Sequence, residues 1–159
     1  MNNKGFTLIE FLIYISISVI LISSLTLVTV NLLHARGSVA VMEEVSKNAR
    51  FITDNIRYMV RIAESATVDV DGKLILDIPS PATYNQTQIY KDINDNAMID
   101  RGSETALRIN SNRIKVEQLE FTVSNDCVTT EVLISYYVPG GSERYSLEKV
   151  FQLTECIRR

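Results

Sequence analysis

Few side chains in this 159-residue sequence have the types and spacing that could do chemistry. Glu10 is an acid at the edge of a long apolar run, and Cys127 and Cys156 are the two cysteines. The single histidine, His34, lies at the far end of the same apolar run, so a catalytic triad or a zinc site lacks parts. The sequence also has no glycine-rich phosphate loop. We therefore predict a protein that is not an enzyme.

One short polar segment carries oxygen atoms that could bind calcium, namely Asp92, Asn94, Asn96 and Asp100. An EF-hand loop needs a glycine where this segment has Ala97, and its final acid is also missing. Asp and Asn are also the residues that turns favour, which explains the composition without a metal. We expect no cofactor, and this segment is the calcium candidate.

The element that positions Glu10 is an apolar segment able to cross a membrane. Only Lys4 and Glu10 are charged among the first 34 residues, and residues 11–33 read FLIYISISVILISSLTLVTVNLL. At about 1.5 Å per residue this run spans a hydrocarbon core of about 30 Å. Lys4 predicts a cytoplasmic amino terminus and a head outside the cytoplasm. The alternative is a secretory signal cleaved near Ser38-Val39-Ala40, but such signals have a shorter apolar core.

The acid at the start of this segment requires either a partner or a favourable position. An ionised carboxylate inside a bilayer is costly, and such residues usually pair with another group. The alternative is that Glu10 lies at the interface in the first turn of a helix, where the helix dipole favours a negative charge.

Residues 4–10 read Lys-Gly-Phe-Thr-Leu-Ile-Glu directly before the apolar run, and they resemble the class III signal of type IV pilins and type II secretion pseudopilins. The resemblance implies that prepilin peptidase cuts between Gly5 and Phe6 and that Phe6 is N-methylated. It also implies that Glu10 is an assembly residue, which meets the Phe6 amine of a neighbouring subunit while the apolar helices bundle into a filament core. The alternative is a membrane-anchored binding or adhesion domain that does not polymerise.

The same resemblance implies partners and a location. The expected partners are prepilin peptidase, other pilins or pseudopilins and an inner-membrane assembly platform. A net charge of −3 argues against nucleic-acid binding. The expected location is the inner membrane, crossed once with the head periplasmic or extracellular, and then a type IV pilus or a type II secretion or competence pseudopilus. Many major pilins carry a proline in the apolar helix, whereas no proline precedes Pro79 here, so a minor pilin or minor pseudopilin is favoured.

Beyond the apolar segment, the hydrophobic spacing predicts an amphipathic helix. Apolar residues recur at steps of three and four: Val39, Met42, Val45, Ala49, Ile52, Ile56, Val60 and Ala63. Because proline is absent before Pro79, one helix can run from about Phe6 to Glu64. Its apolar stripe needs a sheet to cover it.

After Ala66, β-branched and aromatic runs alternate with turn residues, which predicts an antiparallel sheet. Asp71-Gly72 predicts a hairpin with a type I′ turn. The expected strands are Thr67–Val70, Lys73–Ile78, Gln88–Ile93, Ala97–Arg101, Ala106–Asn110, Arg113–Ser124, Val128–Val138 and Arg144–Leu153, the last two joined by residues 139–142. The loop at residues 79–87 is a candidate for partner contact.

The predicted fold is α+β and pilin-like, with a long amino-terminal helix packed on an antiparallel β-sheet head. It comprises a leader (1–5), a transmembrane or filament-core helix (6–34), an amphipathic stem helix (35–66) and a β-rich head (67–159). Both cysteines lie in the head on the oxidising side of the membrane, which predicts one disulfide worth about 3–4 kcal/mol. Two buried thiols are the alternative.

Overall fold

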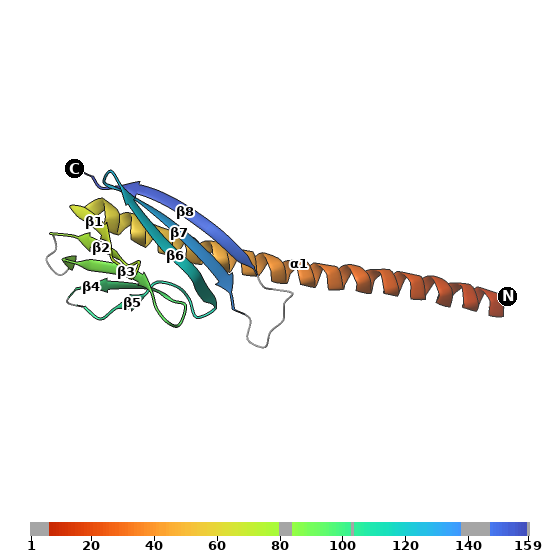
Figure 1. Ribbon diagram of the computed structural model, residues 1–159. Coiled ribbons are helices and arrows are strands. Elements are labelled where there is room, and N and C mark those ends of the chain that lie inside the picture. The colour runs from red at the N-terminus through yellow and green to blue at the C-terminus, as the bar shows by residue number, and fades with distance from the viewer. Residues whose placement is uncertain (1–6, 80–83, 103, 138–146, 159) are drawn as a thin grey trace. The chain divides into compact units, whose positions relative to one another are not determined.

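The structure is a computed structural model that describes residues 7–79, 84–102, 104–137 and 147–158. Its elements in chain order are α1 (Leu8–Ile62), β1 (Ser65–Val68), β2 (Leu74–Asp77), β3 (Thr87–Lys91), β4 (Ala97–Arg101), β5 (Leu107–Arg108), β6 (Ile114–Ser124), β7 (Cys127–Tyr136) and β8 (Glu148–Cys156) (Figure 1). The chain divides into two compact units, Met1–Ala40 and Val41–Arg159. The single long helix expected from the sequence is confirmed.

Within the first unit, α1 is apolar and exposed all round. Every large apolar side chain from Leu8 to Leu33 is at least 44% exposed. By length and composition α1 is able to cross a membrane, because its most apolar stretch has a mean hydropathy of 2.4 with no buried residue.

Within the second unit, residues 41–62 of α1 form a stem that packs into one core with the strands. The stem buries Val41, Val45, Ala49, Ile52, Ile56, Met59 and Val60. Most of the predicted stripe is therefore confirmed, but Val39 and Met42 are exposed. Val41 is buried instead, because it stands directly in line with Val45 and Ala49 at steps of four, whereas Met42 is turned about 100° away from it.

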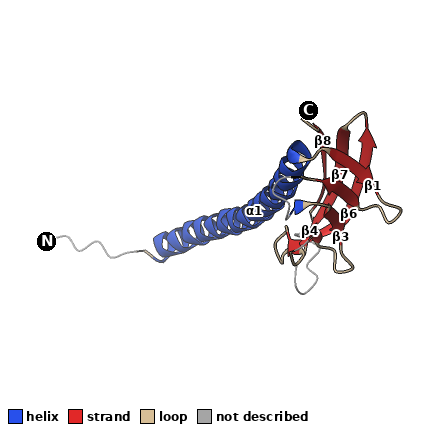
Figure 2. Ribbon diagram, turned by 90° about the vertical axis from the view of Figure 1, so that its left-hand side faces the viewer, coloured by secondary structure: helices blue, strands red, loops and turns tan. Residues whose placement is uncertain are grey.

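The strands form two antiparallel sheets rather than the single sheet expected from the sequence. One has the order β1-β2-β3-β4-β5, and the other has the order β6-β7-β8. Both contribute buried side chains to the core around the stem, and Figure 2 shows the strands gathered beside it. The sheets join where the Val116 N–H donates to the Asp95 carbonyl at 2.8 Å. The break falls after β5, which has only two residues where the sequence predicted a strand over Ala106–Asn110.

The first hairpin is confirmed, but its predicted turn type is wrong. β1 and β2 pair with Val68 opposite Leu74. In the turn between them only Gly72 has a positive φ, at 76°, whereas a type I′ turn needs two such residues. The Asp69 N–H donates to the Lys73 carbonyl at 2.9 Å, so three residues rather than two form the tip.

The other strands occur where they were expected, with shifted ends. β3 stops at Lys91, and Ile93, which was expected in that strand, is 98% exposed in the following turn. Gly102 just after β4 has a φ of 62°, and a Cβ there would lie 2.5 Å from the Asn85 carbonyl oxygen. A side chain at this position would therefore meet fixed backbone. The 139–142 connection and residues 80–83 of the predicted contact loop lie outside the described residues.

Candidate functional site

Thr7 and Glu10 close the amino-terminal end of α1. The N–H and the hydroxyl of Thr7 each donate to Glu10 Oε2 at 2.9 Å, and the Glu10 N–H donates to Thr7 Oγ1 at 3.4 Å. A threonine cap and a glutamate three residues later that bond reciprocally form a capping box. Glu10 thus lies in the first helical turn, as the dipole alternative expected, and it has a partner in its own chain.

Sequence reasoning missed Thr7, although the spacing Thr-x-x-Glu before an apolar run is the recognised signal of a capping box. Gly5 and Phe6, the expected cleavage pair, lie outside the residues that the structure describes. The structure therefore places Glu10 and adds Thr7 to the amino-terminal site.

The hydroxyls in the apolar part of α1 are bonded within the helix. Ser16, Ser18, Thr26 and Thr29 each donate to the carbonyl four residues earlier at 2.8 Å. Ser24 donates to the carbonyl three residues earlier at 3.0 Å. Such bonds supply a partner where neither water nor another chain is present, which lowers the cost of placing these residues in hydrocarbon.

Residues 1–26 match the family described as the prokaryotic N-terminal methylation motif, a class III prepilin signal. The match supports a type IV pilin-like protein. The matched residues include Gly5, Phe6, Thr7 and Glu10, so the capping box lies inside the motif. A motif of this family points to a structural subunit processed by prepilin peptidase rather than to an enzyme. No curated protein and no solved structure matches the chain.

The disulfide predicted from the sequence is present in the head. Cys127 begins β7 and Cys156 ends β8, and the two residues stand opposite each other with their Cα atoms 3.9 Å apart. The disulfide closes a ring that contains β7, β8 and the residues that connect them. It therefore fixes the far end of the last strand to its neighbour.

An ion pair also fixes β8, from the side that faces the stem. Glu155 accepts a hydrogen bond from Arg61 Nε at 2.8 Å, and Arg57 Nε lies 3.4 Å from its other oxygen. The hydrogen bond from Arg61 holds the pKa of Glu155 below its ordinary value against the opposing effect of burial, and the charges of Arg61, Arg57 and Arg158 act in the same direction. No sequence pattern predicts the contact between Arg61 and Glu155, because the two residues lie 94 positions apart.

Asn110 joins the two sheets from within the core, and the sequence analysis did not single it out. Its Oδ1 accepts the Ala97 N–H at 2.9 Å, at the start of β4. Its Nδ2 donates to the Ile114 carbonyl at 2.7 Å, at the start of β6. The side chain is 9% exposed, so both bonds are shielded from water.

The four calcium candidates all lie in the β3–β4 hairpin, where Asp92 organises the turn. Its Oδ1 accepts the N–H groups of Asn94 and Asn96 at 2.9 and 2.7 Å, and its Oδ2 accepts Asn96 Nδ2 at 2.9 Å. Burial acts to raise the pKa of Asp92, and the bonds from Asn96 and Asn94 outweigh it and lower that pKa. Asp100 stands on β4 opposite Gln88. Within the described ranges, no group of three or more His, Cys, Asp or Glu could hold a metal ion.

Proposed function

We propose that this chain is a structural subunit, a minor pilin or pseudopilin, of a type IV pilus or of a type II secretion or competence pseudopilus. The observation that carries the proposal is the methylation motif over residues 1–26, which overlaps the exposed apolar part of α1. Prepilin peptidase cuts between Gly5 and Phe6, and Phe6 is N-methylated. The chain is held in the inner membrane by α1, and the assembly platform passes it into the filament.

The apolar part of α1 gives the physical reason for assembly. Large apolar side chains over residues 8–33 are at least 44% exposed, so this surface needs a bilayer or other apolar helices to cover it. A subunit that leaves the bilayer keeps the surface covered only if helices of neighbouring subunits pack around it. A bundle of such helices is the core of a filament.

Glu10 is the group that we assign to the contact between subunits. Both bonds from Thr7 reach Oε2, which leaves Oε1 for a second donor. Cleavage after Gly5 creates a positively charged amine on Phe6 at the edge of the bilayer. The Glu10 carboxylate of an incoming subunit neutralises the Phe6 amine of the subunit before it, so that neither charge stays unpaired in an apolar surrounding.

The capping box also favours a second candidate function, a membrane-anchored extracytoplasmic binding domain that does not polymerise. In that case Glu10 does nothing beyond closing α1, and Thr7 is the only partner it needs. The two functions differ in what they require of Glu10. Assembly requires its negative charge, whereas capping requires only a side-chain oxygen that accepts hydrogen bonds.

The variants Glu10→Gln and Glu10→Leu separate these requirements. Glutamine also completes a capping box, so Glu10→Gln keeps the cap and removes the charge, whereas Glu10→Leu removes both. Filaments are sheared from cells that produce each variant, and the chain is measured in the sheared fraction and in the membrane. The proposed function predicts that both variants are inserted and cleaved but are absent from filaments. Normal recovery of Glu10→Gln in filaments would contradict the role of its charge.

The mass and amino-terminal sequence of the chain from its own cells test the processing step. A mature chain that begins with methylated Phe6 supports the proposed function. An intact Met1 supports the anchored domain. A start near residue 41 would contradict both functions, because it would indicate a secreted protein.

A further inference from the structure

The β6-β7-β8 sheet ends in β8, and in the described part of the chain no strand pairs with the outer edge of β8. Hydrogen bonds just beyond the two ends of β8 show which of its groups face that edge. The Tyr136 N–H donates to the Leu147 carbonyl at 3.1 Å, and the Ile157 N–H donates to the Asp126 carbonyl at 2.9 Å. Because hydrogen-bonded pairs alternate along an antiparallel ladder, the residues that turn their N–H and C=O groups away from β7 are Glu148, Val150, Gln152, Thr154 and Cys156.

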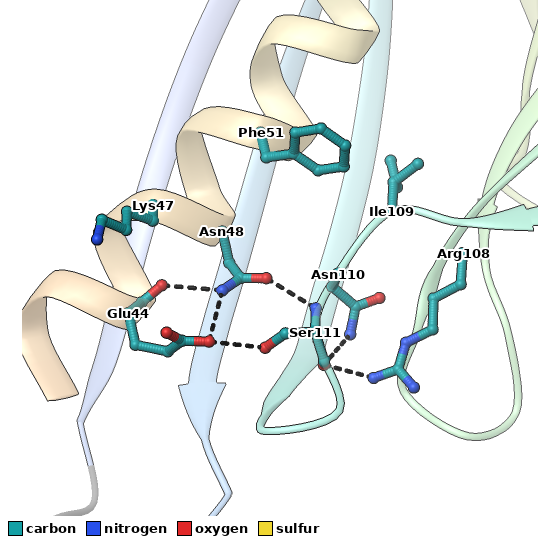
Figure 3. A pocket seen from close by; sticks show the side chains of 8 residues that line it. All are labelled: Glu44, Lys47, Asn48, Phe51, Arg108, Ile109, Asn110 and Ser111. Atoms are coloured by element: carbon teal, nitrogen blue, oxygen red, sulfur yellow. Dashed lines mark hydrogen bonds between the residues drawn. The ribbon is translucent and has the colours of Figure 1, made fainter.

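The other sheet edges of the head are short or already bonded. β1 has four residues and β5 has two. The segment after β5 is tied to the stem, because the Ser111 N–H donates to Asn48 Oδ1 at 2.7 Å and Ser111 Oγ donates to Glu44 Oε1 at 3.0 Å (Figure 3). The ladder of β6 is interrupted by a register shift after Val116, whose N–H donates to the Asp95 carbonyl. β8, by contrast, pairs over nine residues without a shift, so its edge is both long and regular.

The edge of β8 lacks the features that keep a long edge strand from pairing, which are proline, a bulge or charged side chains. β8 contains no proline, and two of its three charged side chains are engaged within the head. Glu155 pairs with Arg61 of the stem, and Lys149 Nζ lies 5.2 Å from the centre of the Phe151 ring. The third is Glu148, at the very start of the strand. Residues 150–154 therefore form an edge without a charged side chain.

The side chains of β8 alternate between two faces. Phe151 and Leu153 are partly buried and pack against the core, whereas Gln152 between them is exposed. A strand added at the edge would continue an apolar row beside Phe151 and Leu153 and a polar row beside Gln152. The Cys127–Cys156 disulfide already holds β8 to its neighbour, so a partner strand binds an edge that is in place before it arrives.

We propose that the outer edge of β8 binds an extended strand from the head of a different pilin-like subunit, which adds a fourth strand to this three-stranded sheet. Backbone N–H and C=O groups of that strand pair with those of Val150, Gln152 and Thr154. Its apolar side chains cover Phe151 and Leu153, and the side chain opposite Gln152 is polar. The inference rests on the proposed function, and it adds where the two heads meet and which conformation the partner brings.

A second copy of this chain does not fit this edge. Its other sheet edges are short or already bonded, so it has only its own β8 to offer. Antiparallel pairing of two β8 strands is a twofold contact that points the two stems in opposite directions. Parallel pairing turns one sheet over and puts the stems on opposite faces of the joined sheet. In neither arrangement do both stems continue side by side into one bundle of apolar helices, so the strand comes from another subunit, as a minor role requires.

The test crosslinks the β8 edge of the full-length chain in its own cells. The photoreactive residue p-benzoylphenylalanine is incorporated at Gln152, and the captured protein and its crosslinked peptide are identified by mass spectrometry. We expect a second protein that carries its own prepilin signal, joined through a segment in which apolar and polar residues alternate.

Glu120 is the matched control site for the crosslink. Glu120, Glu131 and Gln152 stand in one row across the sheet, and Glu120 lies two strands from the β8 edge. The same photoreactive residue at Glu120 should give no crosslink. An equal yield from Glu120 overturns the docking at the edge, because the partner would then lie on the face of the sheet.

Proline tests the backbone bonds separately from the side chains. Gln152→Pro removes an N–H that faces the outer edge and leaves the bonds to β7 in place, whereas Gln152→Val keeps that N–H and changes only the side chain. With the photoreactive residue at Val150, Gln152→Pro should lower the crosslink yield by at least about fivefold, the effect of one lost hydrogen bond. Gln152→Val should leave the yield unchanged. A yield that Gln152→Pro does not lower overturns the backbone pairing.

Amide hydrogen exchange gives an answer that needs no variant, and so it decides the matter even if Gln152→Pro fails to fold. The amides of Val150, Gln152 and Thr154 should exchange quickly in the isolated chain in detergent and slowly in sheared filaments. Equal exchange in the two samples overturns the docking.

Filament entry of the wild-type chain, scored in the same cells, separates the docking from the proposed function. Filaments that contain the wild-type chain, with no crosslink from Gln152, overturn the docking and leave the proposed function standing. A Gln152 crosslink to a second copy alone overturns the assignment to another subunit. A wild-type chain that never enters filaments overturns both the proposed function and this source of the strand.

Discussion

Replacement of Asn110 with alanine should destabilise the head strongly, although Asn110 lies outside the amino-terminal motif. The change leaves the Ala97 N–H without its acceptor and removes the donor to the Ile114 carbonyl. An unsatisfied buried group costs about 1–3 kcal/mol, and a lost ordinary hydrogen bond costs about 1 kcal/mol. Together these terms predict a loss of about 2–4 kcal/mol in the free energy of unfolding.

The assay is denaturant unfolding of the full chain in detergent, followed by near-ultraviolet circular dichroism of its tyrosines. Asn110→Asp should not restore the lost stability at neutral pH, because its buried carboxylate would place an oxygen that carries no proton against the Ile114 carbonyl. Asn112→Ala is the matched control, since Asn112 is exposed and its replacement should change stability by less than about 0.5 kcal/mol. An Asn110→Ala chain as stable as this control would refute the role of Asn110 as the link between the sheets.

Three further predictions concern the head. Cys127→Ser with Cys156→Ser should lower the free energy of unfolding by about 3–4 kcal/mol and increase amide hydrogen exchange in β8, because the ring is no longer closed. Gly102→Ala should lower the thermal midpoint more than Gly72→Ala, since both have positive φ but only at Gly102 does a Cβ meet backbone; equal midpoints would contradict this. The pKa of Glu155 is lowered in the folded state, so its pairing stabilises the head above the ordinary value of 4.5 and is lost as pH falls through the folded value. Glu155→Gln should therefore flatten the fall in thermal midpoint from about pH 6 to about pH 3.

The long helix and most of its buried face could be predicted because they depend on local pattern. Steps of three and four identified Val45, Ala49, Ile52 and Ile56 as core residues, and all four are buried. The disulfide could be predicted because the head has two cysteines and its expected location is oxidising, so each cysteine has the other as its partner. In both cases the deciding information lies in residue type and spacing alone.

The division into two sheets could not be predicted, because it depends on contacts between distant residues. In the sequence Asn110 only ends the predicted strand Ala106–Asn110, and the fold alone places it between Ala97 and Ile114. The type I′ turn was wrong for a related reason. Asp71-Gly72 is the favoured dipeptide, but the register of β1 and β2 sets a three-residue tip in which only the glycine has positive φ.

At the amino-terminal site, the sequence identified the acid and missed its cap. The cost of an ionised Glu10 in a bilayer predicted a partner of some kind, and the family resemblance implied a partner in another subunit, whereas a nearer partner stands three residues away in the same chain. The structure supplies Thr7 as that partner. Charge neutralisation between subunits and capping within one subunit are compatible, because they use different oxygens of the same carboxylate.

The capping box has a consequence for maturation. The bond proposed for cleavage, between Gly5 and Phe6, precedes both Thr7 and the first helical residue, Leu8, in the chain, so the proposed cut breaks no hydrogen bond of the capping box. Under the proposed function, Thr7 and Glu10 both stay in the mature chain and keep the cap. Removal of the leader would then change the charge next to the start of the helix while the hydrogen bonds that cap it stay in place.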